Sequence, residues 1–160
     1  MVQLTNSHFK SGTFVANEDN VEYILQEDII FNPLPENDNH PIPAPNCGDY
    51  CGKEYEIGFF AVMAINAENV VVNLNGKTMK AHNDFVKNQR FMSIIELGAT
   101  PFLTNQGPND FGAWTSRINN VVIRNGKIGL SSHHGIYGNN VRNILIRNFD
   151  FEMTKRATNI

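Results

Sequence analysis

Apolar residues in this chain recur in short β-branched runs that end in Asn or Asn-Gly. The two most similar runs, 120–126 and 143–149, begin their apolar positions at Val121 and Ile144, which lie 23 residues apart. A looser copy starts at Val70, 51 residues before Val121, which is about two such periods. One strand per repeat of this length, each burying its apolar face against its neighbours, is typical of a solenoid.

Within each run, apolar residues alternate with polar or outward positions. The inward positions are Val70, Val72 and Leu74, then Val121 and Ile123, then Ile144 and Ile146. This period of two predicts strands with one face on a core. The continuous apolar run 58–65 fits a strand covered on both faces, or a short buried helix by periodicity alone. A further apolar run, 91–97, lies midway between the copies.

Helical periodicity is weak throughout, and residues 81–89 are the best helix candidate. A hairpin-based sandwich would space its strands only about 8 to 12 residues apart. The pattern therefore predicts an all-β fold, a right-handed parallel β-helix of about five turns.

Two proline- and glycine-rich segments interrupt the pattern and predict long loops. Five prolines fall within residues 32–56, and proline has no backbone N–H to donate to a neighbouring strand, so this segment leaves the sheet. Residues 98–117 form a second such excursion. We expect one domain over 1–160, with an irregular N-terminal cap and excursion at 1–57 and regular turns at 58–153. Because residues 154–160 form only a thin polar cap, the chain is either the N-terminal part of a longer coil or is covered there by another copy or protein.

Asparagines mark the ends of the strands. Asn75, Asn125 and Asn148 each follow an apolar run, and asparagine tolerates left-handed backbone geometry. Stacked from turn to turn, these side chains predict an internal amide ladder. Gly76 and Gly126 follow two of them, where a positive φ costs glycine nothing.

The repeats 120–126 and 143–149, with the looser copy 69–76, resemble the right-handed parallel β-helix superfamily of pectate lyases, polygalacturonases and many phage tailspikes. The segments 27–33 and 131–139 are more narrowly similar to uncharacterised β-helix proteins of large DNA viruses and microbes. The resemblance implies a β-helix and a carbohydrate-directed or structural role. The superfamily's catalytic aspartates and its lyase arginine have no residue-by-residue counterpart here.

Composition excludes several classes of partner. The 160 residues carry 18% charged side chains and a net charge of −3, so no basic field suits nucleic acid. No apolar run approaches the roughly 20 residues of a membrane span. The first ten residues lack a signal-peptide pattern, so we expect an intracellular protein or one packaged in a virion.

We expect neither a metal nor a cofactor. Cys47 and Cys51 are the two cysteines, and His40 is their nearest histidine. A zinc site would require a second ligand pair, so loop thiols or a local disulfide is the simpler interpretation.

The candidate catalytic residues fall into two groups. His133, His134 and Tyr137 suit a base and a proton donor for polysaccharide β-elimination, although neighbouring residues on a strand face opposite sides unless the backbone turns. Asp150 and Glu152 share a face about 6 to 7 Å apart, within the range of glycosidase carboxylates. The alternatives are a packed histidine beside a solvated one, and a surface strand with its acids in water. The other candidate acids are Asp84, Glu96 and Asp110.

Candidate ligand-binding residues are Arg124, Arg147, Trp114 and Asn139. The two arginines occupy equivalent places in adjacent turns, which would suit an acidic sugar, although solvated arginines are commoner. Trp114 offers an aromatic face for a sugar, or packs its loop against the core. The sequence thus supports two hypotheses: a module that binds or cleaves an acidic polysaccharide, and a non-catalytic structural or assembly protein. In either case, self-association or another protein is expected at the open C-terminal end.

Overall fold

The computed structural model describes residues 1–10, 12–32, 61–88, 92–98, 118–138 and 141–159, and the side chains of all of these except 87, 88 and 153–159. Its strands are β1 Val2–Leu4, β2 Phe14–Ala16, β3 Glu22–Leu25, β4 Ile29–Phe31, β5 Ala61–Ile65, β6 Val70–Asn73, β7 Thr78–Ala81, β8 Ser93–Leu97, β9 Ile118–Gly138 and β10 Val141–Asn159. Two short helices join them, the 3-10 helix η1 Asn6–Phe9 and the α-helix α1 Asn83–Asn88.

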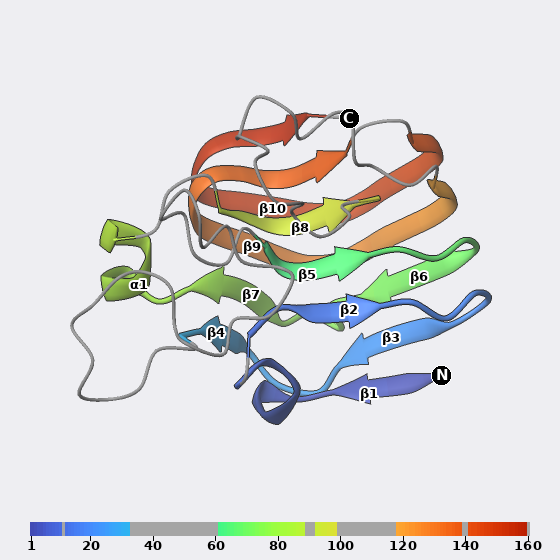
Figure 1. The fold of residues 1–160 in the computed structure, drawn as a ribbon, viewed down its shortest axis with the longest axis horizontal. Coiled ribbons are helices and arrows are strands. Elements are labelled where there is room, and N and C mark those ends of the chain that lie inside the picture. The colour runs from blue at the N-terminus through green and yellow to red at the C-terminus, as the bar shows by residue number, and fades with distance from the viewer. Residues whose placement is uncertain (11, 33–60, 89–91, 99–117, 139–140, 160) are drawn as a thin grey trace, which may run out of the picture.

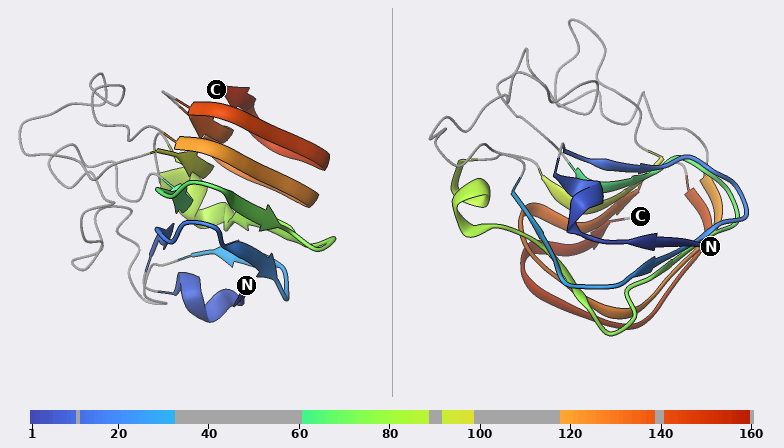
Figure 2. Two further views of the ribbon diagram at one scale, coloured as in Figure 1. Left: turned by 90° about the vertical axis from the view of Figure 1, so that its right-hand side faces the viewer. Right: turned by 90° about the horizontal axis from the view of Figure 1, so that it is seen from below.

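Every pairing between described strands is parallel. The main path runs β1-β3-β6-β9-β8-β5-β2, with β10 on β9 and with β7 joined to both β4 and β9. The strands stack from the N-terminus at one end to the C-terminus at the other, and the sheet curls around its interior (Figures 1 and 2). The expectation of an all-β fold with parallel strands is therefore confirmed.

Strand β9 explains how the sheet curls. Its successive parts pair with β6 at Val121, with β7 at Lys127 and with β8 at Ile136. Strand β10 then follows β9 from Val141 to Asn159, with one irregularity after Thr154. One continuous strand thus turns two corners and pairs with four other described strands.

The spacing of the repeats is partly as predicted. Val121 and Ile144 are direct register partners, as their 23-residue separation required. Val70 and Val121 are direct partners too, so the interpretation of their separation as two periods is wrong. The extra length in the sequence includes β7, α1 and β8, which lie outside this row of strands.

Strands reach both ends of the described chain. Parallel pairing begins at Val2, which pairs with Tyr23. Strands β2, β3 and β4 lie in residues 9–31, whose β-forming residues predict short strands. At the other end β10 continues to Asn159, which pairs with Tyr137, so residues 154–159 extend the strand where we expected a thin cap. Most of the two predicted loops lies outside the described residues.

The core is built from rows of apolar side chains that run across the strands. Tyr23, Val72 and Ile123 are register partners on adjacent strands. All three are buried, because each is covered by apolar side chains of the strands on either side. Burying each aliphatic side chain contributes about 1.5–3 kcal/mol. Ile146 extends this row on β10 but is only partly buried. Strand β5, from the continuous apolar run, is buried at every position and is a strand.

Asparagines in left-handed geometry form the corners, as expected. Asn125 and Asn148 have φ of 61° and 51°, and Asn148 Nδ2 donates to Asn125 Oδ1 at 3.2 Å. The third predicted member is wrong: Asn125 Nδ2 donates to Asn73 Oδ1 at 3.2 Å, and Asn75 donates to the Leu25 carbonyl. The corner between Asn73 and Thr78 is two residues longer than its counterpart between Arg124 and Lys127, which displaces Asn75.

A second ladder, which the sequence analysis missed, lies where the strands begin. Asn69, Asn120 and Asn143 all have left-handed φ values, between 54° and 57°. Asn120 Nδ2 donates to Asn69 Oδ1 at 3.0 Å, and Asn143 Nδ2 donates to Asn120 Oδ1 at 3.1 Å. The recurrent asparagine before each valine-rich run was the sequence signal for it.

Gly76 has a positive φ of 75°, as predicted, whereas Gly126 does not, so the prediction is wrong for Gly126. Gly126 is needed for space instead: a side chain there would overlap Leu74 and approach the Lys77 carbonyl oxygen to 2.7 Å. Helix α1 lies within the predicted segment 81–89. None of the helices in the described ranges has the length and apolar character that a membrane crossing requires.

Candidate functional site

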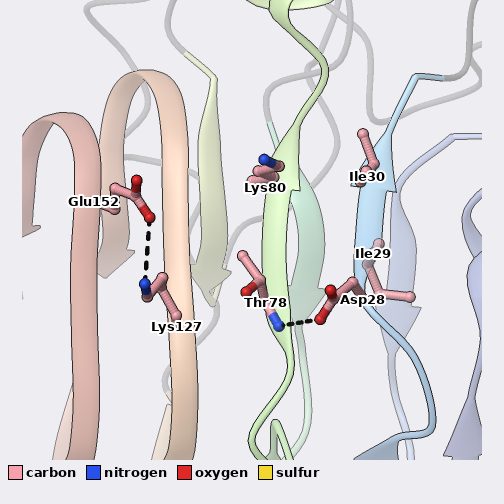
Figure 3. Close-up of a pocket in the computed structure, with 7 residues that line it drawn as sticks. All are labelled: Asp28, Ile29, Ile30, Thr78, Lys80, Lys127 and Glu152. Carbon is pink, nitrogen blue, oxygen red and sulfur yellow. Dashed lines mark hydrogen bonds and ion pairs between the residues drawn. The ribbon is translucent and has the colours of Figure 1, made fainter.

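A shallow groove lies on the outward face of β4, β7 and β9, with β10 at its edge. Ile29, Met79, Ile128 and Phe151 are register partners that point toward the core, so their sequence neighbours point outward. The groove encloses about 150 Å³. Its lining residues are Asp28, Ile29, Ile30, Thr78, Lys80, Lys127 and Glu152 (Figure 3).

Charges of both signs surround this groove. Asp28 accepts a hydrogen bond from the Thr78 backbone N–H at 2.8 Å. Lys127 Nζ lies 3.5 Å from Glu152 Oε2, with 43% and 57% of these side chains exposed. Such an exposed pair contributes at most about 1 kcal/mol, so a ligand can replace either partner at little cost. Lys80 lies farther along β7 than Thr78 and has no ion-pair partner among the described residues (Figure 3).

An apolar side chain completes the groove. Ile30 is 48% exposed, which is unusual for isoleucine, and its register partner is Lys80. The groove therefore offers an aliphatic surface beside an ammonium group, with carboxylates on either side.

The predicted carboxylate pair lies at this groove. Asp150 pairs with Lys127, and Glu152 pairs with Gly129, so the two acids share the outward face as expected. Glu152 lines the groove and contacts Lys127, whereas Asp150 is exposed beside it and is not among the lining residues. The strand geometry brings the two together, and Lys127 is their charged neighbour.

The predicted histidines and tyrosine gather elsewhere, where β9 meets β8. The rings of His133 and His134 are 3.9 Å apart and nearly perpendicular, and the His134 ring lies 5.1 Å from that of Tyr137. Adjacent residues meet here because β9 turns a corner between its pairing with β7, which ends at Gly129, and its pairing with β8, which begins opposite Ile95. The left-handed residue at this corner is Leu130, with a φ of 51°.

Glu96 joins this cluster as the register partner of Tyr137. Only 7% of Glu96 is exposed, and burial raises its pKa well above the usual 4.5, against a smaller opposing effect of the nearby Ser93 hydroxyl. Burial also raises the pKa of Tyr137, and the charge of Glu96 raises it further. Burial of this kind favours the protonated form of a carboxyl group, and a protonated carboxyl can donate a proton.

Access limits what the Glu96 cluster can do. His134 is 1% exposed and Glu96 is 7% exposed, so neither meets solvent directly. Glu96 appeared in the sequence only as one acid among several. Its position inside the apolar run 93–97 was the signal that it is buried.

The predicted arginines are paired in register but differ in surroundings. Arg124 and Arg147 are direct partners on β9 and β10. Arg124 Nη2 binds Glu22 Oε1 at 2.8 Å, and Asn73 Nδ2 donates to the same oxygen at 3.2 Å. Arg124 therefore serves to join turns, and Arg147 alone is exposed for a ligand.

Other predictions fall outside the described residues, namely Trp114, Asn139, Cys47, Cys51 and His40. In the part of the chain that is described, no group of three or more His, Cys, Asp or Glu side chains is placed to hold a metal ion. Comparison with known proteins adds no assignment: no protein-family model, curated protein or solved structure matches this chain.

Proposed function

We propose that the chain forms turns of a right-handed parallel β-helix and acts as a carbohydrate-directed module that binds an acidic polysaccharide. The parallel pairing of β10 along the length of β9 supports the coil. The groove on the outward face supports the ligand, because it combines a concave shape with converging polar groups.

The composition of the groove carries the proposal. A sugar ring has an aliphatic C–H face, which suits exposed Ile30, and hydroxyl groups, which suit Asp28 and Glu152. A uronic acid also bears a carboxylate, for which Lys80 and Lys127 supply positive charge. A neutral sugar would leave Lys80 without a counterion.

The arrangement of strands suits a polymer. Ile30, Lys80 and Glu152 come from strands in one register row, with Gly129 between the last two. Neighbouring strands are about 4.8 Å apart, so successive sugars laid along this row would meet equivalent positions of successive strands. Binding is the proposed activity, and Asp150 and Glu152 are the groups to test if products of cleavage are found.

A panel of acidic and neutral polysaccharides, measured by calorimetry or affinity electrophoresis, tests the proposal. We expect a Lys80→Ala, Lys127→Ala double variant to bind acidic polymers at least tenfold more weakly. Added salt should also weaken the binding of acidic polymers to the unaltered chain. Lys10→Ala, which changes an exposed lysine just after η1 and outside the groove, should bind as the unaltered chain does. Absence of binding to every acidic polymer, or equal losses in both variants, would contradict the proposal.

The structural alternative has an observation of its own. Strand β10 pairs only with β9 among the described strands, and its inward residues Ile144 and Phe151 are partly buried. A particle mass that rises with concentration, without binding to any glycan, would favour an assembly role.

A further inference from the structure

The two asparagine ladders have a uniform direction. In the first, Asn120 donates to Asn69 and Asn143 donates to Asn120. In the second, Asn125 donates to Asn73, and Asn148 donates to Asn125. Each side-chain amide thus gives its N–H to the preceding turn and presents its carbonyl oxygen toward the following one.

This direction leaves two acceptors at the end of the stack. Asn143 and Asn148 both donate backward, and no described group donates to the Oδ1 of either. They lie five residues apart, as Asn120 and Asn125 do one turn earlier. The edge of β10 therefore carries two carbonyl oxygens at the spacing of the chain's own repeat.

The apolar rows end at the same edge. Val121 and Ile123 are fully buried between two neighbours, whereas their partners Ile144 and Ile146 are only partly buried. Phe149 and Phe151 continue this incompletely covered surface around the next side. The outer backbone edge of β10 has no partner among the described strands. Among the described residues, the backbone pairing, the apolar rows and the ladders therefore all end at β10.

We propose that the β10 edge binds an extended polypeptide segment that adds to the sheet as a parallel strand and carries asparagine at two positions five residues apart. The two asparagines of the segment donate to Oδ1 of Asn143 and Asn148, and β-branched residues following the first asparagine cover Ile144 and Ile146. Backbone hydrogen bonds provide affinity in such strand addition, and the side chains provide specificity.

The ladder direction specifies the chemistry of the partner. The free oxygens require N–H donors, so asparagine fits and aspartate does not, because a carboxylate would place oxygen against oxygen. Arg142 and Arg147 are exposed on β10, so simple charge attraction would favour the aspartate version. The two explanations of binding therefore predict opposite preferences. This inference is independent of the carbohydrate proposal, since the ladder asparagines do not line the groove.

A peptide with the sequence of residues 119–127 is the probe, measured by fluorescence anisotropy against the full chain. We expect saturable binding, and about tenfold weaker binding for a peptide with aspartate at the positions of Asn120 and Asn125, from the loss of two hydrogen bonds. No saturable binding up to millimolar peptide, or equal or tighter binding of the aspartate peptide, would overturn the proposal.

Variants of the protein separate the ladder from general stability. Asn148→Gly keeps the left-handed backbone but removes the acceptor, and should weaken peptide binding. Asn148→Asp keeps an acceptor, although it loses its bond to Asn125, and should bind the peptide better than Asn148→Gly does. Circular dichroism is the control that checks whether both variants are folded. Lys80→Ala, Lys127→Ala should bind the peptide normally, so that failure of either proposal is distinguishable from failure of the other. Equal peptide affinity in both Asn148 variants would argue against the ladder contact.

Discussion

At the scale of single residues, Glu96 is the side chain most at odds with its surroundings. It lies on β8 between the buried neighbours Ile95 and Leu97, and beside Tyr137 on β9. Alternation along the strand directs its side chain away from the face that Ile95 and Leu97 share. Its neutral form is favoured there, because transfer of an unpaired carboxylate from water is costly.

Ionisation of the Glu96 carboxyl should therefore lower the stability of the protein as the pH rises. An acid whose pKa is raised on folding contributes its full stability below its unfolded value, near 4.5, and loses it as pH rises through the folded value. Glu96→Gln removes this ionisation, so its melting temperature should exceed that of the unaltered chain at pH 9 by several degrees, with little difference at pH 4. Thermal melts across this pH range provide the measurement.

Glu152→Gln is the matched control, because it makes the same chemical change at an exposed acid. It should leave the pH profile nearly unchanged. A flat difference between Glu96→Gln and the unaltered chain from pH 4 to pH 9 would show that Glu96 is not buried as a neutral acid.

Residue types alone predicted part of the Glu96 cluster. His133, His134 and Tyr137 attracted notice as a polar group on a regular segment, and the structure brings their rings together. Glu96 lies 41 residues before its partner Tyr137 in the sequence, and residues between them include the excursion 99–117. Only the register of β8 on β9 reveals that contact.

At the scale of elements, the asparagine corners hold adjacent strands in register. Asn125 has a φ of 61°, donates to Asn73 and accepts from Asn148. A left-handed φ costs most residues about 1–2 kcal/mol, whereas glycine adopts it freely. Backbone geometry and side-chain bonding can therefore be separated by substitution.

Asn125→Gly should cost about 1–3 kcal/mol in free energy of unfolding, from lost ladder hydrogen bonds. Asn125→Ala should cost about 1 kcal/mol more, because alanine adds the penalty of the left-handed backbone. Chemical denaturation of both variants gives the difference. Equal costs in the two variants would mean that φ at this corner is not constrained.

The strands were easier to predict than the corners. Alternating β-branched residues fix which side chains face inward, so Val121 opposite Ile144 followed directly from spacing. The ladder partner of Asn125 could not be predicted from spacing. The corner 74–77 is longer than the corner 125–126, and the repeat alone does not show where the extra residues lie.

At the scale of the whole molecule, each turn is stabilised by the turns on either side of it. Ile123 and Ile146 are register partners in one row, yet Ile123 has no exposed surface whereas Ile146 is only partly buried. In a stack of this kind, stability is approximately a sum of terms within turns and between neighbouring turns.

The same isoleucine-to-alanine substitution should therefore cost different amounts of stability at different positions in that row. Ile123→Ala should destabilise the chain by about 2–5 kcal/mol, as expected for a buried cavity, and Ile146→Ala by distinctly less. Urea denaturation measures both. A cost at Ile146 equal to that at Ile123 would indicate that β10 is covered as fully as β9 in solution.

The fold class was predictable from the chain because one pattern recurs along it, and parallel pairing is what a repeat of about 23 residues requires. The groove was not predictable. Asp28, Thr78, Lys127 and Glu152 come from four strands or their approaches, and no segment of the sequence contains two of them within a short motif. Stacking brings them together, and stacking depends on the lengths of the excursions.

The central position of β9 also determines when the strands can pair during translation. Strands β6, β7 and β8 are all made before β9, and each has an edge that only β9 later occupies. Until the ribosome has added residues 118–138, three parallel edges stay open to wrong partners. From the end of β8 at Leu97 to Gly138 the ribosome adds 41 residues, which takes roughly 2–8 s at about 5–20 residues per second. A nascent chain stalled just before Ile118 should accordingly require a chaperone, whereas one released after Gly138 should have closed those edges by itself.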